Sequence, residues 1–248
     1  MKKMTETTPH LAPVVVLLFL GAVFTTGASF LILLYGAARR SRLYVRLGGT
    51  AALTVVACYA LLLCGVSLAS SEKVLPAGGW KYFCELDCHI GYSVSGVQTA
   101  SVTSPELRQT SAQGQFVIVR LKVWFDERTI SPNRGDGPLT PNARGVLLVD
   151  ANGHAYELSP EGEAELAHLA GNSGSLRRPL RPGQSFAKDL VFAVPKDATG
   201  LRLLITDDDA ETHLIIGHEN SMLHKKIYLG LDAAPTITSA ISLLASNR

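Results

Sequence analysis

The stretch LAPVVVLLFLGAVFTTGASFLILLY (Leu11–Tyr35) decides the fold class, because it contains no Asp, Glu, Lys, Arg or His. A second run, GGTAALTVVACYALLLCGVSLA (Gly48–Ala69), lacks these residues too. A helix needs about 20 apolar residues to cross a bilayer, and both runs reach that length. The first run is also longer than the roughly 7–15 apolar residues of a cleaved signal peptide. The two runs therefore predict a transmembrane hairpin over residues 11–69, with spans at about 11–35 and 48–69.

The turn between the runs predicts the orientation of the hairpin. It carries Arg39, Arg40, Arg42 and Arg46. Because Lys and Arg accumulate in cytoplasmic loops, the turn is expected to be cytoplasmic and both termini to lie outside. Small residues at four-residue spacing predict close helix packing, either between the two spans or onto a partner's helices. These residues are Gly21, Thr25 and Ser29 in the first span and Thr50, Thr54 and Cys58 in the second. The spans hold no charge, which argues against a transport path.

The composition and length of the chain limit its partners and the number of its domains. The chain has 248 residues and a net charge of +2, so nothing indicates a nucleic-acid partner. Subtracting the hairpin and the tail leaves roughly 150 residues, which is one ordinary domain. We expect an N-terminal tail over 1–10, a neck over 70–90, a β domain over 91–231 and a C-terminal tail over 232–248.

The pattern beyond the neck is that of β structure. In QFVIVRLKVWFDE (Gln115–Glu127) apolar residues alternate with a mixed face, which indicates a strand with one wetter side. Ala151-Asn152-Gly153 predicts a hairpin turn, and PEGEAELAHLAGN predicts a helix that begins near Pro160. Further short runs, THLIIG among them, predict about seven or eight strands in an antiparallel sandwich. The fold class expected is thus a two-helix transmembrane hairpin followed by an all-β antiparallel immunoglobulin-like sandwich.

Three of these segments carry a family resemblance. FVIVRLKVWFDE, GVLLVDANGHAYEL and LRPGQSFAKDLVFAVP are similar to bacterial extracytoplasmic immunoglobulin-like domains of unknown function, the group of the mycobacterial immunoprotective extracellular protein. The matching positions are Leu148, Asp150, Gly153 and Tyr156 in the hairpin, the turn Pro182-Gly183, and Phe192 to Pro195. The resemblance covers roughly residues 91–231. It implies an Ig-like sandwich tethered to a membrane and implies no catalytic residues.

Cys84, Cys88 and His89 form the sharpest chemical cluster in the sequence. Two thiolates and an imidazole suit copper or zinc, and Met222 or His224 could add a ligand. A disulfide between Cys84 and Cys88 is the favoured alternative, because close cysteines pair in an oxidising compartment. Free thiols are the third alternative.

The overall plan also resembles that of cytochrome oxidase subunit II, which has two spans, both termini outside and a following β domain. That subunit binds binuclear copper through two cysteines at the same spacing. Here His89 adjoins Cys88, Tyr92 stands where the family has a histidine, and the pair precedes the sandwich. These departures weigh against a binuclear copper site.

The other candidate motifs are weak. Arg134-Gly135-Asp136 reads as a loop turn, Asp207-Asp208-Asp209 as a solvated turn, and the histidines at 213, 218 and 224 as surface residues.

We therefore expect a protein that is not an enzyme and has no catalytic or cofactor-binding residues. It would sit in a bacterial cytoplasmic membrane with a periplasmic β domain, as an accessory subunit whose partners are the bilayer and a membrane protein that contacts the hairpin. The alternative is a redox or metal-binding protein that uses Cys84, Cys88 and His89.

Overall fold

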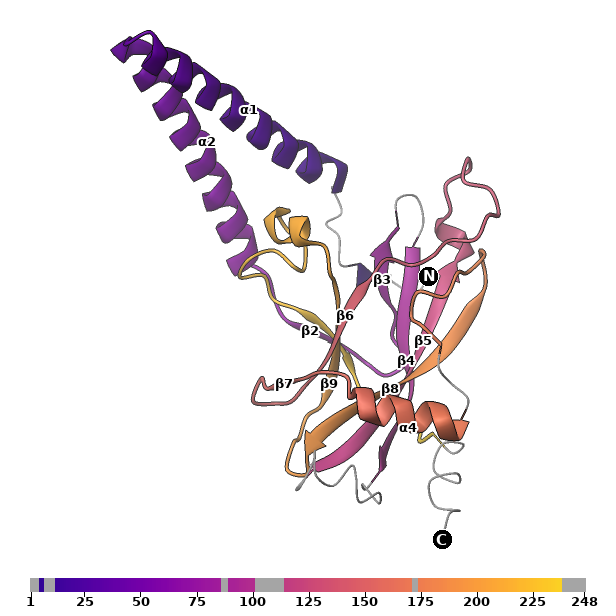
Figure 1. Ribbon diagram of the computed structural model, residues 1–248. Coiled ribbons are helices and arrows are strands. Elements are labelled where there is room, and N and C mark those ends of the chain that lie inside the picture. Colours follow the sequence, from indigo (N-terminus) through magenta and orange to yellow (C-terminus); the bar gives the residue numbers. More distant parts are fainter. Residues whose placement is uncertain (1–4, 7–11, 86–88, 101–113, 171–173, 238–248) are drawn as a thin grey trace. The chain divides into compact units, whose positions relative to one another are not determined.

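The computed structural model describes residues 5–6, 12–85, 89–100, 114–170 and 174–237 (Figure 1). The chain forms two compact units. The helical unit comprises Thr8–Ser71 and Asp209–Lys226, and the β unit comprises Met1–Thr7, Glu72–Asp208 and Ile227–Arg248. The expected order of two long apolar helices followed by a mostly β domain with two sheets is confirmed.

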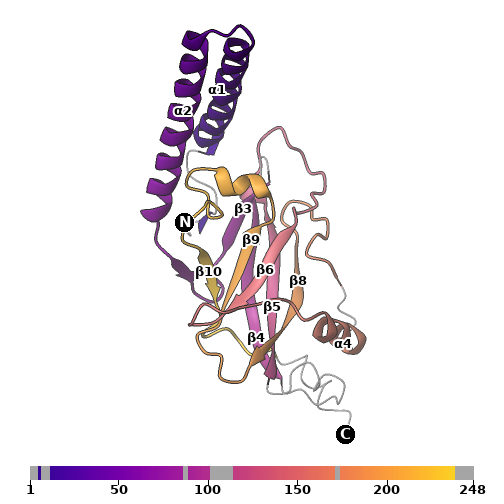
Figure 2. The same cartoon turned by 60° about the vertical axis from the view of Figure 1, so that its left-hand side comes forward.

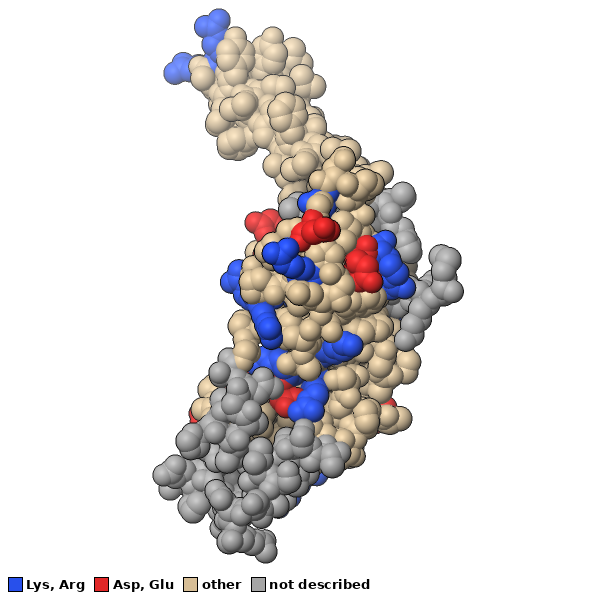
Figure 3. Space-filling model, turned by 90° about the vertical axis from the view of Figure 1, so that its right-hand side faces the viewer, with Lys and Arg blue, Asp and Glu red and all other residues tan. Residues whose placement is uncertain are grey.

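Helices α1 (Ala12–Ala38) and α2 (Arg42–Leu68) form the hairpin, and each has 27 residues. Both are long and apolar enough to cross a membrane. Their large side chains are mostly exposed, and Leu17 (67%), Phe24 (78%) and Leu61 (73%) are examples. In Figure 3 the hairpin is tan along its length and carries basic side chains at its tip. Soluble domains rarely expose an apolar surface of this extent.

Two glycines set the closest approach of the helices. A Cβ at Gly48 would lie 2.6 Å from the Ser29 carbonyl oxygen, and one at Gly36 would lie 2.6 Å from the Val45 nitrogen. Of the small residues expected to line the contact, Ser29 is buried there, whereas a Cβ at Gly21 would have no neighbour within 4 Å. The helices therefore pack most closely near the turn. The turn is also shorter than expected, because Arg42 and Arg46 already belong to α2.

The β unit contains two five-stranded sheets that pack face to face (Figure 2). Sheet A has the order β1-β3-β4-β5-β8, and sheet B has the order β2-β10-β9-β6-β7. The strands of sheet A are β1 (Thr5–Glu6), β3 (Lys81–Cys84), β4 (His89–Ala100), β5 (Gly114–Asp126) and β8 (Ser185–Pro195). Those of sheet B are β2 (Lys73–Leu75), β6 (Arg144–Val149), β7 (Ala155–Tyr156), β9 (Arg202–Asp207) and β10 (Ile227–Gly230).

The alternation along β5 holds as the sequence predicts. Its core-facing residues Val117, Val119, Leu121, Val123 and Phe125 are all at most 2% exposed. They meet residues of both sheets in one apolar cluster. The intervening residues face outward, because successive side chains of a strand point to opposite faces.

The prediction of a wholly antiparallel domain is wrong in detail. β1 runs parallel to β3, and β2 runs parallel to β10. Both short edge strands come from segments outside the expected domain, since β1 lies in the tail and β2 in the neck. β3 also lies in the neck, so this segment supplies a strand to each sheet.

A second correction concerns THLIIG, which was expected to be a strand. Residues Ala210–Leu214 form the short helix η2 instead, and turns follow it. The whole segment Asp209–Lys226 between β9 and β10 belongs to the helical unit. An apolar run of this length fits several local structures, and contacts with α2 decide the outcome here.

The expected helix is α4 (Pro160–Ala170), which covers the outer face of sheet A. Its first turn is capped by Ser159, whose Oγ accepts a hydrogen bond from the Gly162 nitrogen at 3.1 Å. Leu166 then packs with Ile118 and Val191. Gly162 permits this approach, because a Cβ there would lie 2.6 Å from Val191 Cγ1.

Asp150 organises the hairpin between β6 and β7. Its carboxylate accepts hydrogen bonds from the nitrogens of Asn152 (2.9 Å) and His154 (2.8 Å) and from the Tyr156 hydroxyl (3.1 Å). The motif that suggested a family resemblance therefore has a structural role. Burial alone raises the pKa of Asp150, but the hydrogen bonds from His154, Tyr156 and Asn152 outweigh it and lower the pKa to about 2.

We expect the Asp150 carboxylate to stabilise the fold in a pH-dependent manner. Its folded pKa lies below the unfolded value of about 3.9, so its contribution is complete above about pH 4 and is lost as the pH falls toward 2. Asp150→Asn should lower the melting temperature at neutral pH and flatten its decline between about pH 4 and 2. Thermal unfolding followed by circular dichroism measures both effects. Asp136→Asn, in an exposed loop, is the control, and an equal flattening by both variants would contradict the assignment.

Candidate functional site

Two tryptophans from distant parts of the chain meet on the outer face of sheet A. The rings of Trp80 and Trp124 are 5.3 Å apart between centroids and inclined by 59°. Lys122 Nζ lies 6.0 Å from the Trp80 ring, and Arg128 Cζ lies 5.2 Å from the Trp124 ring. We call these four residues the tryptophan platform. Both rings are half-buried and both cations are exposed, so the platform combines aromatic surface with positive charge.

The backbone beneath the platform is shaped to receive it. Trp80 lies over Gly91 of β4, where a Cβ would come within 2.9 Å of the indole ring. Any larger residue at position 91 would therefore displace Trp80. In the structure Phe83 is part of the core between the sheets, whereas Tyr82 belongs to the outer face.

Asp126 holds the cationic side of the platform in place. Its buried carboxylate accepts hydrogen bonds from Arg128 Nε at 2.8 Å, from Arg128 Nη2 at 2.6 Å and from the Tyr82 hydroxyl at 3.3 Å. Burial opposes ionisation of this carboxyl, but the bonds from Arg128 dominate and lower the pKa of Asp126. Burial, reinforced by Asp126, raises the pKa of Tyr82 to about 12. Arg128 is thereby held over Trp124 as a fixed positive charge.

Cys84 and His89 lie directly opposite one another in the β3–β4 ladder, next to the platform. The His89 ring makes an edge contact with Tyr82, with centroids 6.4 Å apart. Cys88 lies outside the described residues. The structure thus gives no support for the expected Cys84–Cys88 disulfide, since it contains no disulfide pair within its described part. Within that part, no group of three or more His, Cys, Asp or Glu residues could hold a metal ion.

A cluster of charges that the sequence did not suggest lies between the two sheets. Arg144 of β6 bonds Glu85 through Nη2 and Asp207 of β9 through Nη1. The side chains of Arg144 and Glu85 are only 1% and 3% exposed. The Arg144 guanidinium also lies 4.2 Å from the centroid of the Phe83 ring. Because Glu85 follows β3 in sheet A, this pair connects the two sheets.

Lys81 makes a second connection. Its side chain is completely buried, and Nζ donates to the carbonyl oxygens of Ile205 (2.6 Å) and Ile227 (2.7 Å). These carbonyls belong to β9 and β10 of sheet B, whereas Lys81 belongs to β3 of sheet A. We call Lys81, Glu85, Arg144 and Asp207 the ionic lock. Sequence rules place lysine and arginine on the surface, so no signal in the chain marked these residues as interior.

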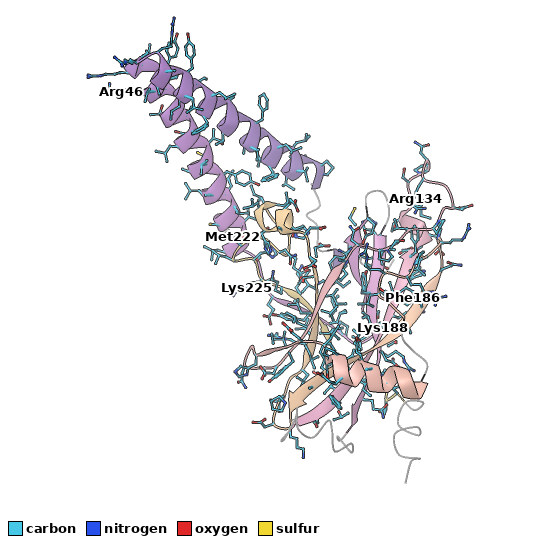
Figure 4. All side chains as sticks on the ribbon, in the orientation of Figure 1. Arg46, Arg134, Phe186, Lys188, Met222 and Lys225 are labelled. Carbon is cyan, nitrogen blue, oxygen red and sulfur yellow. The ribbon has the colours of Figure 1, made fainter. Side chains whose placement is uncertain are left out.

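The remaining sequence candidates have structural roles, and two of them differ from expectation, because Asp207 ends β9 instead of lying in a solvated turn and His218 is buried instead of lying at the surface. Arg134 donates to the carbonyl oxygens of Gly135 and Gly137 (3.2 and 2.9 Å), and Gly135 has a φ of +71°, so the tripeptide is a loop turn. Asp207 is engaged by Arg144. His213 Nδ1 lies 2.7 Å from the Asn220 carbonyl oxygen, and the Asn220 nitrogen donates to His218 Nδ1 at 3.0 Å. Met222 and His224 also belong to the helical unit (Figure 4), whereas Cys84 belongs to the β unit.

Comparison with known proteins places the β unit among uncharacterised domains. Residues 87–213 match the family model described as a domain of unknown function (DUF4352). Two solved structures resemble the chain. A conserved hypothetical protein from Bacillus anthracis is 16% identical over 51% of this chain and 85% of its own, with a TM-score of 0.33. The yjhA protein from Bacillus subtilis is 14% identical over 63% of this chain and 98% of its own, with a TM-score of 0.35. No curated protein matches the chain.

We expect the ionic lock to be essential for the stability of the β unit. Arg144→Met would leave Glu85 and Asp207 without their cation, and removal of one partner of a buried pair costs about 3–5 kcal/mol. Lys188→Met is the matched control, because Lys188 pairs with the partly exposed Glu163 at 3.3 Å and such pairs contribute about 0–1 kcal/mol. Urea unfolding measures the difference. If both variants lose the same free energy of unfolding, the buried pair contributes no more to stability than the partly exposed pair.

Proposed function

We propose that this chain, which belongs to the DUF4352 family of domains of unknown function, is a non-catalytic, membrane-anchored accessory subunit whose β unit recognises a partner. The hairpin anchors the chain in a bacterial cytoplasmic membrane and contacts the helices of a membrane protein. The β unit is an Ig-like sandwich on the periplasmic side. The tryptophan platform is its recognition surface.

The observation that carries the proposal is the exposed apolar surface of α1 and α2. A helix of 27 residues is about 40 Å long, which exceeds the hydrocarbon thickness of about 30 Å. The side chains that would meet lipid or a partner helix, such as Leu17 and Phe24, are uncovered. A hairpin of this kind supports a membrane anchor with surface to spare for helix–helix contacts.

The basic turn supports the proposed orientation. Arg39, Arg40, Arg42 and Arg46 lie in or next to the turn between α1 and α2, and Figure 3 shows basic side chains at the hairpin tip. The sequence flanks of the two spans at the other end hold only Lys2, Lys3 and Lys73, since Lys81 is buried in the β unit and does not count as a surface charge. The excess of arginine therefore favours a cytoplasmic tip and an extracytoplasmic β unit.

The charged groups inside the β unit have structural roles, and this supports recognition rather than catalysis. Asp126 holds Arg128, Asp150 holds a hairpin, and Glu85 belongs to the ionic lock. The platform differs, since Trp80, Trp124 and Lys122 present surface outward. Tryptophan and arginine are enriched where proteins contribute most to binding energy.

A charge reversal on the platform tests this function. The full chain, extracted from native membranes in mild detergent, should co-purify with a membrane protein at fixed stoichiometry. Lys122→Glu should reduce the amount of retained partner about tenfold or more. The partner surface that the wild-type lysine attracts would be repelled by the carboxylate. Lys196→Glu, in an exposed turn after β8, is the matched control and should retain the partner. An isolated wild-type monomer would overturn the accessory role, and equal retention by both variants would overturn the platform.

A second candidate function rests on the register of β3 and β4. Cys84 and His89 are cross-strand neighbours, and this places two of the three ligands expected for copper or zinc side by side. A metal-binding chain should contain stoichiometric copper or zinc after purification, and Cys84→Ser and His89→Ala should each lose it. Elemental analysis measures the content. Purified wild-type chain with no bound copper or zinc after incubation with either ion would refute this candidate.

A further inference from the structure

We propose that the segment Asp209–Lys226 between β9 and β10 is a lipid-contacting element that lies in the boundary between headgroups and acyl chains of the outer leaflet. This inference rests on the proposed membrane anchor. It adds a third membrane contact to the two spans, and this contact comes from a part of the sequence that the apolar-run criterion does not select.

The position of the segment on α2 sets its depth. The Tyr59 hydroxyl donates to the Leu214 carbonyl oxygen at 2.6 Å, and the Lys225 nitrogen donates to Ser70 Oγ at 2.8 Å. Tyr59 lies nine residues before the end of α2 at Leu68, which corresponds to about 13 Å along the helix axis. The segment is therefore bonded both beyond the end of α2 and well inside it.

The arginines in the first turns of α2, Arg42 and Arg46, indicate where the hydrocarbon layer begins. If Arg42 or Arg46 lies at the inner headgroups, about 20 residues of hydrocarbon end between roughly residues 62 and 66. Tyr59 is then about 5–10 Å below the outer boundary. Interfacial elements are buried to about this depth. Leu214 is thus held at the level of the upper acyl chains.

The exposed side chains of the segment suit that level. Leu214, Met222 and Leu223 are 43%, 56% and 61% exposed. Figure 4 shows Met222 near the end of α2 that lies farthest from Arg46. The exposed Lys225 follows closely, and a lysine can bury its stem in lipid while its charge stays among the headgroups. The segment thus combines exposed apolar side chains with a basic end, and its exposed acidic residues Asp209 and Glu211 lie at its start, near the β unit in the sequence.

The segment also satisfies much of its own backbone, as a chain in lipid must. Ile215, His218 and Met222 donate their backbone N–H groups to Thr212, Ile215 and His213 at 3.1–3.3 Å. The Ser221 hydroxyl donates to the Ile215 carbonyl oxygen as well. The Leu214 carbonyl is bonded to Tyr59, so several backbone polar groups of the segment are paired within the helical unit while the side chains of Leu214, Met222 and Leu223 stay exposed.

Depth-dependent quenching tests the inference. The full chain is reconstituted into phosphatidylcholine vesicles with or without bromine on the acyl chains, and variants add one tryptophan to the native Trp80 and Trp124. Met222→Trp and Leu214→Trp should lose most of their added emission when bromine is placed near the ester end. Leu53→Trp, 71% exposed on α2, reports on the span and should be quenched by mid-chain bromine. Asn133→Trp, in an exposed loop of the β unit, should keep its emission.

The outcomes separate this inference from the anchor itself. Quenching of Leu53→Trp without quenching of either Met222→Trp or Leu214→Trp would overturn the lipid contact and leave the anchor standing. That result would also follow if a second copy of the chain covered the segment. Absence of quenching at all three positions would overturn the anchor as well. Quenching of Asn133→Trp to the same degree as Met222→Trp would show that the effect is not specific and would likewise overturn the proposal.

Discussion

The buried charges between the sheets are the interaction on which the register of the β unit depends. Lys81 and Arg144 are removed from water. The cost of burying each charge must therefore be offset by hydrogen bonds to carbonyl or carboxylate oxygens that are held at fixed positions. Both reach across the core from one sheet to the other. A sliding of β3 by one residue would turn Lys81 outward and leave the carbonyls of Ile205 and Ile227 without their donor. The ionic lock therefore fixes the register of β3 as firmly as its few ladder bonds do.

The same constraint determines what the outer face of sheet A presents. With Lys81 and Phe83 held inward, the alternation of the strand sends Tyr82 and Cys84 outward. Trp80, which immediately precedes β3, then meets Trp124 over Gly91. The platform is thus a consequence of the lock, although no platform residue belongs to the lock. Loss of Arg144 would be expected to loosen a recognition surface that it does not touch.

Local patterns in the sequence predicted the elements that depend on local physics. The alternation in β5, the start of helix α4 near Pro160 and the turn around Gly153 follow from side-chain period, the position of proline and backbone freedom. Contacts between distant segments were not predictable in this way. Nothing near Trp80 indicates that Trp124 lies beside it. One usable signal was present, since the outward face of β5 alternates Arg120, Lys122 and Trp124, a mixture suited to binding. The cluster at Cys84 remains a sequence hypothesis, because Cys88 lies outside the described residues.

The failure at THLIIG shows why apolar runs are ambiguous even when they are well placed. A strand and a turn can both carry the consecutive apolar residues Leu214, Ile215 and Ile216, so side-chain pattern alone does not separate them. What separates them is where the backbone polar groups find partners. A strand at this point would bond to β9 or β10, whereas the segment bonds to itself and to Tyr59 of α2. A tyrosine within an apolar helix needs an acceptor for its hydroxyl, and the Leu214 carbonyl supplies one. Together with Ser70, which accepts a hydrogen bond from the Lys225 nitrogen, the ring of Tyr59 therefore connects the hairpin to the loop between β9 and β10.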